Sequence, residues 1–258
     1  MLKKVEAHIN QNLPFLHGKK ILIACSGGLD SVVLAHIFTK LRFTIALAHC
    51  NFSLRGSEST ADQTFVHKLA EKWNIPCYSG TFNTKTFSKT HKISTQMAAR
   101  ELRYSWFAQT ATNLDYDYVL TAHHADDAME TFFINLSRGT GLRGLKGIPQ
   151  TNGKVVRPLL PFTRADLLAF AKSENIFWRE DSSNTSTQYT RNKLRLQVLP
   201  AYKQLTKNTV PNFQRSLHHL QQDHTLLEDY MVLIRKLVMR EARVGYAIDV
   251  LKLKELTN

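Results

Sequence analysis

The chain has 258 residues, a hydrophobic fraction of 43% and a formal net charge of +13. This length suits one large α/β domain with a smaller appendage, and the hydrophobic fraction is that of a folded globular protein. Lys and Arg outnumber the acidic residues 34 to 21 and are spread along the chain. We therefore expect a polyanionic partner, with nucleic acid first, while a basic protein without such a partner stays an alternative.

The cysteines and the apolar runs exclude several classes of protein. Cys25, Cys50 and Cys77 lie far apart and form no Cys-x-x-Cys pair, so nothing supports a zinc site, an iron–sulfur cluster held by such pairs or a disulfide framework. No apolar run approaches the ~20 residues of a membrane span, and Met1–Lys4 begins no signal-peptide core. A reducing, cytoplasmic location is expected.

Strand-like and helix-like segments alternate over the first half of the chain. The predicted strands are Ile21–Cys25, Phe43–His49, Ile75–Tyr78 and Tyr118–Ala122, and the predicted helices are Ser31–Lys40, Ser59–Trp73, Thr95–Asn113 and Asp126–Leu136. This alternation predicts the α/β class, with a parallel, twisted, Rossmann-like sheet covered by helices on both faces. Ligands of such sheets bind beyond the carboxyl ends of the strands.

The second half of the chain is less regular. We expect a flexible basic stretch too rich in glycine for a helix at Gly139–Gly147, a short strand at Val155–Leu160, a helix at Leu167–Glu174 and a polar stretch at Asp181–Thr187. Beyond Pro200 the apolar residues recur at helical spacing, which predicts a purely helical unit that includes surface histidines at His218, His219 and His224. The predicted domains are residues 1–205 and a small helical appendage, 206–258.

The most informative stretch is Ser26–Ser31, Ser-Gly-Gly-Leu-Asp-Ser, which joins a predicted strand to a predicted helix. Two adjacent glycines allow a tight turn that gathers backbone N–H groups around an anion, and the helix N-terminus adds partial positive charge. Two serines supply hydroxyl groups, and Asp30 can cap the helix or hold magnesium. The pattern predicts a phosphate cradle that is not a Walker loop; an ordinary strand-to-helix turn is the alternative.

A second stretch, His123–Thr131, begins at a strand end and runs into a helix. Asp127 and Glu130 are three residues apart and therefore share one face of that helix near its N-terminus. Two such carboxylates can hold magnesium or a substrate ammonium group, whereas a solvated acidic first turn is the alternative. Because these two stretches and the turn at His49 all follow strands of one parallel sheet, we expect the three segments to face a single cleft.

With these motifs the chain resembles the tRNA(Ile)-lysidine synthetases, a family of the ATP pyrophosphatase superfamily with the adenine nucleotide α-hydrolase type of fold. That family carries Ser-Gly-Gly-x-Asp-Ser, His-His-x-Asp-Asp-Gln-x-Glu-Thr and Arg-Gly-Thr-Gly-x-x-Gly-Leu motifs. This chain matches them at Ser26–Ser31, His123–Thr131 and Arg138–Leu145. Further matches lie at His49–Arg55, Ala98–Tyr104, Arg157–Leu159, Asp181–Asn184, Arg191–Arg195 and Pro200.

Two positions depart from the family pattern. Ala128 stands where Gln is usual, which removes an amide that positions a substrate, and Phe52 stands where a second His is usual, which removes a polar contact in the cleft. Neither departure touches the carboxylates or the phosphate loop. Because the family continues into a C-terminal tRNA-binding domain, residues 206–258 are interpreted as the truncated start of that region.

The resemblance implies an ATP-dependent ligase that converts the wobble cytidine of the CAU-anticodon isoleucine tRNA into lysidine. The base carbonyl oxygen attacks the α-phosphorus of ATP and pyrophosphate leaves; the ε-amine of free L-lysine then attacks the activated carbon and AMP leaves. ATP and Mg²⁺ are the implied cofactors. The family is often dimeric, and the sequence leaves the choice between monomer and homodimer open.

The resemblance also implies roles for matching residues. The catalytic set is Asp30, Arg100, Arg103, Asp127 and Glu130. Lysine binds to Asp127 and Glu130, and Mg²⁺ binds to Asp30 and Asp127. ATP binds to Ser26, Gly27, Gly28, Leu29, Asp30, Ser31 and His49. The tRNA phosphates bind to Arg138, Arg143, Lys146, Arg191, Lys193 and Arg195, for which a solvated basic face is the alternative.

Two other function classes stay open. The first is another enzyme with the same loop, a tRNA thiolase or a small-molecule amidating synthetase. Thiolases rely on Cys-x-x-Cys pairs or a catalytic cysteine, and small substrates leave the basic charge unexplained. The second is a nucleotide-binding regulator without catalysis, against which the intact Asp30, Asp127 and Glu130 argue.

Overall fold

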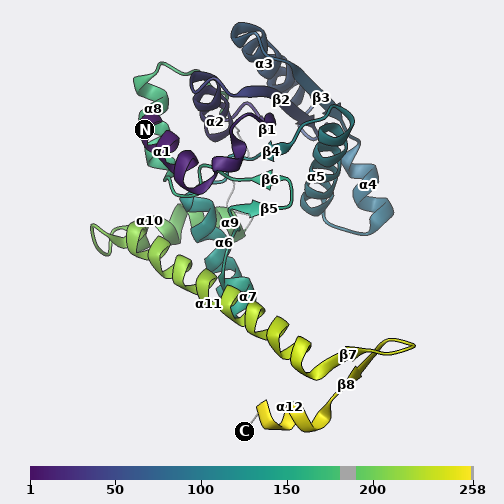
Figure 1. The fold of residues 1–258 in the computed structure, drawn as a ribbon. Coiled ribbons are helices and arrows are strands. Elements are labelled where there is room, and N and C mark those ends of the chain that lie inside the picture. Colours follow the sequence, from purple (N-terminus) through teal and green to yellow (C-terminus); the bar gives the residue numbers. More distant parts are fainter. Residues whose placement is uncertain (181–189, 257–258) are drawn as a thin grey trace.

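The computed structural model describes residues 1–180 and 190–256, and its core is the α/β sheet domain expected from the sequence (Figure 1). The six-stranded sheet has the order β3-β2-β1-β4-β6-β5. Its strands are β1 (Lys20–Ala24), β2 (Thr44–Asn51), β3 (Cys77–Thr81), β4 (Tyr118–Leu120), β5 (Thr151–Asn152) and β6 (Val155–Val156). All pairs are parallel except β5 with β6. The strand order reverses between β1 and β4, which is the switch point where such sheets bind ligands.

Alternation along β1 divides the core into two layers. Ile21 and Ile23 are buried on one face, whereas Leu22 is buried on the other. The first face packs against α1 (Leu2–Asn12), α2 (Leu29–Lys40), α3 (Ser57–Trp73) and α8 (Arg164–Ser173). The second face packs against α5 (Thr95–Asn113). The sheet is therefore covered on both sides, as its continuous apolar strands require.

Several segments of the sheet domain differ from expectation. The glycine-rich stretch contains a short helix, α7 (Leu142–Leu145), so the expectation of no helix there is wrong. The Asn135 side chain at the end of α6 (Ala125–Ser137) donates to the Gly144 carbonyl oxygen at 2.9 Å, and this contact offsets the low helix propensity of glycine. The helix α4 (Thr84–His91) and a 3₁₀ turn at Pro14–Leu16 were not anticipated.

The strand expected at Val155–Leu160 is shorter than predicted. It stops at Val156, because Pro158 has no N–H with which to continue the ladder. The Arg157 backbone N–H donates to the Gln150 carbonyl oxygen at 2.9 Å instead, and its guanidinium donates to the Pro149 carbonyl oxygen at 2.8 Å. The chain therefore turns away from the sheet at this point.

The C-terminal part begins with α9 (Thr190–Lys193), a π-helical turn (Leu194–Val198), α10 (Leu199–Lys203) and the long α11 (Thr209–Val238). Beyond α11, β7 (Met239–Glu241) pairs antiparallel with β8 (Tyr246–Ile248) before α12 (Val250–Leu256). The expectation of a purely helical unit is therefore wrong at this hairpin, where Gly245 supplies the left-handed turn conformation and Tyr246 and Ile248 favour strands. The polar stretch Asp181–Thr187 lies outside the described residues.

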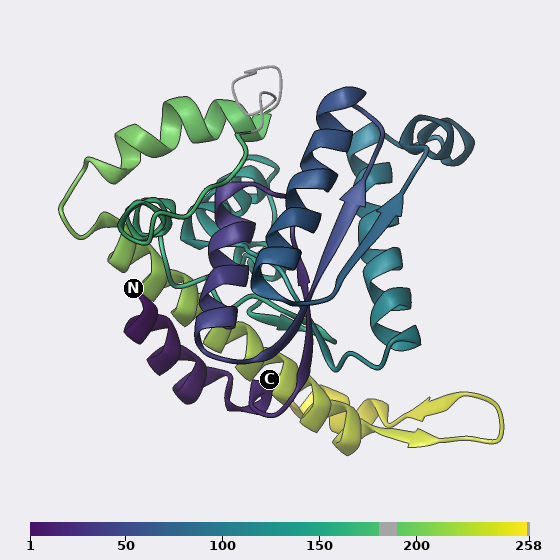
Figure 2. The ribbon, with the colours of Figure 1, turned by 90° about the horizontal axis from the view of Figure 1, so that it is seen from above.

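A third apolar cluster attaches α11 to the sheet domain. Ala128 and Met129 of α6 pack with Leu199 of α10 and with Phe213 and Leu217 of α11. The other end of α11 and the β7–β8 hairpin project away from the sheet (Figure 1, Figure 2). The domain boundary at 205–206 stays a prediction. Within the described part of the chain, no helix is both long and apolar enough to cross a membrane.

Candidate active site

The Ser26–Ser31 loop follows β1 at the switch point and is held by its own side chains. The Ser31 hydroxyl accepts from the Ser26 backbone N–H at 3.2 Å and donates to the Gly28 carbonyl oxygen at 2.9 Å. Gly27 has φ +90°, and a Cβ there would lie 3.4 Å from the Phe65 ring. The loop therefore has a fixed shape that requires glycine, and it leads directly into α2.

Two neighbouring segments support this loop. His49, at the end of β2, is buried and its Nδ1 donates to the Cys25 carbonyl oxygen at 2.9 Å, so the ring lies behind the loop rather than in the cleft. The Arg179 backbone N–H donates to the Gly27 carbonyl oxygen at 2.9 Å, and the Arg179 side chain pairs with Asp62 of α3. His49 can therefore act on a nucleotide through the loop, but it does not line the cleft.

A cleft of about 530 Å³ opens in front of the loop. It is lined by the loop, the strand ends, α5, residues 178–180 and the arginines of the segment after residue 190. The predicted site residues among its lining are Ser26, Gly28, Leu29, Asp30, Ser31, Arg103, Asp127, Arg191 and Arg195. The expectation that the phosphate loop and the start of α6 face one cleft is therefore met by the geometry.

A buried histidine joins the carboxylates of the two motifs. The His124 Nε2 lies 3.5 Å from Asp30 Oδ2 and 3.5 Å from Asp127 Oδ2, and its Nδ1 lies 3.7 Å from Asp126 Oδ2. Burial lowers the pKa of His124, but the three carboxylates outweigh that effect and raise it above its ordinary value. The His124 ring thus lies between three carboxylates that favour its charged form.

Asp126, unlike Asp127, makes contacts that hold elements of the fold together. Its Oδ2 accepts from the Arg164 backbone N–H at 2.8 Å, and its Oδ1 pairs with the Lys203 ammonium. Although burial acts to raise the pKa of Asp126, these two partners lower it overall. The residue therefore ties the starts of α6 and α8 to α10.

Glu130 is fully buried beneath two arginines. Its Oε2 accepts from Arg191 Nε at 2.7 Å, and its Oε1 accepts from Arg195 Nε at 2.5 Å. The Arg195 Nη2 also lies 3.4 Å from Asp127 Oδ1. The two arginines predicted to meet tRNA phosphates thus contact the two carboxylates predicted to meet lysine, and a lysine ammonium reaches Glu130 only by displacing a guanidinium.

The predicted arginines of α5 occupy different positions. The Arg103 guanidinium lies over the Phe52 ring, 5.1 Å from its centroid, and lines the cleft. Arg100 lies over the Tyr104 ring at 4.8 Å and is not among the residues that line the cleft. Phe52 therefore supplies a cation–π platform for Arg103.

The departure at Ala128 has a packing consequence. Ala128 is buried in the apolar cluster between α6, α10 and α11, and it is not among the cleft-lining residues. A longer, polar side chain at this position would have to fit that cluster. The expectation that Ala128 removes a substrate-positioning amide therefore has no support from the placement of this residue.

The other basic residues predicted to meet tRNA lie apart from the carboxylates. Arg138, Arg143 and Lys193 are exposed. Lys146 is half-buried, and its Nζ lies 3.5 Å from Nδ1 of His224 on α11. His224 is itself buried, so the expectation of a surface position is wrong for this histidine: the packing of α7 against α11 covers it.

Sequence reasoning missed several contributors to the cleft. His124 and Arg164 meet Asp30, and Trp178, Arg179 and Glu180 form part of the wall. The Trp178–Glu180 run directly precedes the Asp181–Asn184 match to the family, and this position was a usable indication that it belongs to the site. The pairing of His124 with residues of another element could not be read from spacing.

Asp30 has the features expected of a magnesium ligand. Its Oδ1 is buried without a hydrogen-bond partner among the described residues, and Arg164 Nε lies 3.9 Å from it. In the described part of the chain, no group of three or more His, Cys, Asp or Glu side chains could share a metal ion. A lone free carboxylate oxygen in a phosphate site fits Mg²⁺, which binds through one or two carboxylates together with substrate phosphates.

Burial disfavours the thiolate form of the cysteines in this region. Burial raises the pKa of Cys25 to about 11 and that of Cys50, which lines the cleft, to about 12. All three cysteines are free. Because the thiolate is the nucleophile, neither Cys25 nor Cys50 is activated for sulfur transfer at neutral pH.

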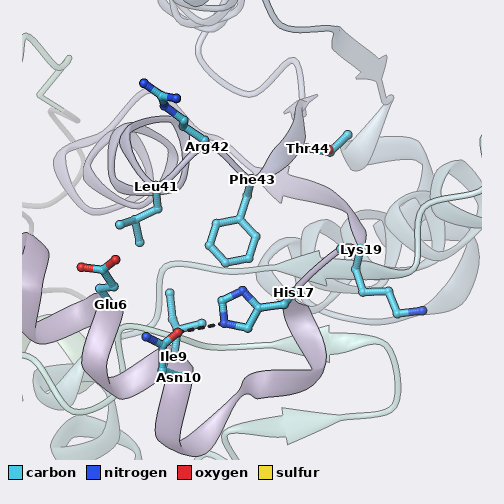
Figure 3. A pocket seen from close by; sticks show the side chains of 10 residues that line it. Glu6, Ile9, Asn10, His17, Lys19, Leu41, Arg42, Phe43 and Thr44 are labelled. Carbon is cyan, nitrogen blue, oxygen red and sulfur yellow. Dashed lines mark hydrogen bonds between the residues drawn. The ribbon is translucent and has the colours of Figure 1, made fainter.

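A second, smaller pocket lies at the opposite edge of the sheet, where β1 and β2 begin (Figure 3). It measures about 180 Å³ and is lined by α1 and by the turns before β1 and β2, with His17 stacked on Phe43. None of the predicted site residues is among the described residues that line it. The larger cleft at the switch point is therefore the candidate active site.

Comparisons with known proteins show the family of this chain. Residues 1–202 match the family described as PP-loop domain. The tRNA(Ile)-lysidine synthase of Petrotoga mobilis is 35% identical over 217 residues, which cover 83% of this chain and 70% of that protein. The chain belongs to the tRNA(Ile)-lysidine synthase family of PP-loop proteins.

Other relatives differ more in length. The tRNA(Ile)-lysidine synthase of Porphyromonas gingivalis is 41% identical over 84% of this chain but over 47% of its own length. The chain thus spans about half the length of several curated relatives that it matches. Among solved structures, the U34-tRNA thiolase NcsA from Methanococcus maripaludis with its 4Fe-4S cluster has a TM-score of 0.67 over 84% of this chain and 79% of that chain. At 17% identity, this likeness shows a shared fold alone.

Proposed function

We propose that the chain forms lysidine in the CAU-anticodon isoleucine tRNA, using ATP and free L-lysine. The observation that carries this proposal is the meeting of the Ser26–Ser31 loop and Asp127 across one cleft, in a chain of this family. A phosphate loop alone suits any nucleotide-binding protein. A carboxylate that already attracts guanidinium groups, placed opposite that loop, suits an enzyme that also binds a cationic substrate.

The first step activates the cytidine. The base carbonyl oxygen attacks the α-phosphorus of ATP, and the bond from that phosphorus to the pyrophosphate oxygen breaks. Backbone N–H groups of the Ser26–Ser31 loop and the N-terminus of α2 stabilise the charge that develops on the phosphates. Arg103 and Arg164, which line the cleft, add positive charge to the same region.

Magnesium has one assigned residue in this proposal. Asp30 would hold Mg²⁺ through its free oxygen, and the ion would neutralise phosphate charge during activation. Asp127 is then left for lysine, although both carboxylates are candidates for the metal by family resemblance.

The second step transfers lysine. Asp127 attracts the ε-ammonium group in place of the Arg195 and Arg191 guanidinium groups, which lie 3.4 Å and 3.9 Å from its Oδ1. The carboxylate accepts the proton, the free amine attacks the activated carbon, and AMP leaves with the electrons of the broken carbon–oxygen bond. Glu130 holds the two arginines, so its contribution to lysine binding depends on their exchange.

Sulfur transfer is the second candidate function. The U34-tRNA thiolase shares the fold, but the thiol pKa values of Cys25 and Cys50 are raised by burial rather than lowered. This chain therefore supplies no activated cysteine among its described residues, and the thiolase hypothesis has weaker support.

The deciding experiment is the transfer of radiolabelled lysine to bulk bacterial tRNA with ATP and magnesium, followed by mild alkali. Alkali removes aminoacyl esters and leaves lysine that is bound to a base. The proposal predicts alkali-stable label on the CAU isoleucine tRNA, which disappears when ATP is omitted. Absence of stable label, with tRNA-dependent pyrophosphate release retained, would contradict lysine as the nucleophile.

A further inference from the structure

Arg179 is fixed beside the phosphate loop through both its backbone and its side chain. Its backbone N–H donates to the Gly27 carbonyl oxygen at 2.9 Å, and a Cβ added at Gly28 would lie 4.0 Å from the Arg179 carbonyl oxygen. Its side-chain Nε donates to Oδ1 of Asp62 on α3. The main chain of Arg179 therefore lies against the two adjacent glycines of the loop, and its guanidinium is held from the side of α3.

The far end of this guanidinium is available to a ligand. A guanidinium carries five N–H donors, of which the contact with Asp62 uses one. Neither Nη1 nor Nη2 of Arg179 donates to another of the described residues, although the side chain is 38% exposed and lines the cleft. An arginine with a free pair of Nη groups suits a phosphate, to which it can donate two parallel hydrogen bonds.

Arg179 and Arg164 approach the loop at different points. The Arg164 Nε lies 3.9 Å from Oδ1 of Asp30, near the end of the loop where α2 begins. Arg179 instead contacts Gly27, near the beginning of the loop. An anion that binds along the loop would therefore meet positive charge at both places, in addition to the backbone N–H groups.

Asp62 is a buried carboxylate that joins two segments around the loop. It is only 9% exposed, and its Oδ2 accepts from Arg55 Nη2 at 2.8 Å while its Oδ1 accepts from Arg179. Arg55 belongs to the segment after β2, whereas Arg179 belongs to the segment after α8. Because both carboxylate oxygens are used, Asp62 restricts the rotation of the Arg179 side chain and keeps its Nη groups at the cleft.

We propose that Arg179 binds the two phosphates of ATP that leave as pyrophosphate, and that Asp62 is the positioning residue that orients Arg179. The inference rests on the use of ATP proposed above. When the bond from the α-phosphorus breaks, its electron pair goes to the pyrophosphate oxygen, and the Arg179 guanidinium stabilises the negative charge there. Asp62 acts only through Arg179 and does not touch the nucleotide.

Titration calorimetry with ATP, AMP and inorganic pyrophosphate, in the presence of magnesium, tests the phosphate contact. Arg179→Gln is expected to raise the dissociation constants of ATP and pyrophosphate at least about tenfold. AMP lacks the two phosphates in question, so its dissociation constant should change by less than about twofold. Arg215→Gln is the matched control, because Arg215 is exposed on α11, and it should leave all three affinities unchanged.

A double-mutant cycle tests the positioning role. Asp62→Asn is expected to weaken pyrophosphate binding at least about threefold in the wild-type background, and to have no further effect in Arg179→Gln. Asp117→Asn is the control, since Asp117 also pairs with a lysine and accepts a backbone N–H, but next to the start of β1. A merely structural role of Asp62 would weaken AMP binding equally and would add to the effect of Arg179→Gln.

Arg179→Lys tests the same role without changing Asp62. Lysine keeps the charge, but it cannot bind Asp62 through one nitrogen and hold a phosphate through two others. We expect its pyrophosphate affinity to fall at least about threefold, while AMP affinity is retained. Melting temperatures measured alongside identify any variant that does not fold.

Four results would overturn the proposal. They are a wild-type chain that binds neither ATP nor pyrophosphate, an Arg179→Gln variant that loses AMP and pyrophosphate affinity equally or loses neither, an Asp62→Asn effect that persists in Arg179→Gln, and wild-type pyrophosphate affinity in Arg179→Lys. These titrations contain neither tRNA nor lysine. A failure of lysine transfer would therefore leave their outcome unchanged, and the two proposals can fail separately.

Discussion

At the residue scale, the phosphate loop depends on a backbone conformation that only glycine adopts readily. Gly27 has φ +90° and lies against Phe65, whereas Gly18 also has positive φ, +71°, but has open space around it. Gly27→Ala is expected to cost about 1–2 kcal/mol of unfolding free energy and to weaken ATP binding, because the loop must shift.

Gly18→Ala is the control for backbone strain alone. It is expected to lower the melting temperature without changing the dissociation constant for ATP, measured by titration calorimetry. Equal loss of ATP affinity in both variants would show that the loop shape at Gly27 has no specific role.

His123 gives the protein a pH dependence of stability. Burial lowers its pKa to about 4, below the ordinary value near 6.5. Between these two values the unfolded chain binds a proton that the folded chain does not, so the free energy of unfolding decreases as the pH falls.

The expected decrease between pH 7 and pH 5 is roughly 1–2 kcal/mol from this residue. Urea unfolding at both pH values measures it, and His123→Gln should lose that part of the pH dependence. His218→Gln, on the exposed face of α11, is the control and should keep it. Indistinguishable pH dependence in His123→Gln and the wild type would contradict the assignment.

At the element scale, α9 and the π-helical turn are joined to α6 through Glu130. Arg195→Ala leaves one oxygen of the fully buried Glu130 without its partner, and the expected loss of stability is about 2–3 kcal/mol. Lys193→Ala, at an exposed position two residues away, is expected to change stability by less than about 0.5 kcal/mol. Equal stabilities in urea unfolding would mean that Arg195 is free to meet tRNA instead.

The elements also show which features local sequence patterns can predict and which they cannot. The strands β1, β2 and β4, the helix Thr95–Asn113 and the phosphate loop depend on local periodicity and turn chemistry, so they could be predicted. The edge strand β3 was predicted too, but it lies at Cys77–Thr81, two to three residues beyond the predicted range. The pairing of Glu130 with Arg191 and Arg195 joins residues 61 and 65 positions apart, and no local pattern reports it. For the same reason the sequence suggested tRNA contacts for these arginines, whereas the structure pairs them with carboxylates in the cleft.

At the scale of the whole molecule, the net charge of +13 comes from basic side chains of two kinds, those that pair with carboxylates in the cleft and those on the outer surface. Arg191 and Arg195 are paired, whereas Arg138 and Arg143 beside α7 are exposed. The Arg138→Ala, Arg143→Ala double variant is expected to reduce the slope of log affinity for tRNA against log salt concentration by about 1–2.

The matched control is the Lys3→Ala, Lys4→Ala double variant, which removes the same charge from exposed positions on α1. Filter binding over a range of salt concentrations measures both slopes. A slope that is unchanged in the α7 variant, or reduced equally in both, would mean that Arg138 and Arg143 are only a solvated basic face.

The fold class of the whole molecule could be predicted from the sequence, but several details of its arrangement could not. The α/β sheet and a cleft at its carboxyl edge follow from strand and helix alternation. The β7–β8 hairpin and the buried position of His224 do not, because both depend on how α11 packs and where it ends.

We propose that one cleft carries two separable steps, with the Ser26–Ser31 loop serving activation and Asp127 serving lysine transfer. The most direct measurement follows pyrophosphate release and lysine transfer in parallel for Asp127→Asn with the CAU isoleucine tRNA. Asn keeps the shape and can still accept from the His124 backbone N–H, which Asp127 binds at 3.0 Å. We expect lysine transfer to be reduced by about 10²-fold or more, with tRNA-dependent pyrophosphate release retained. Wild-type lysine transfer, or equal loss of both steps, would contradict it.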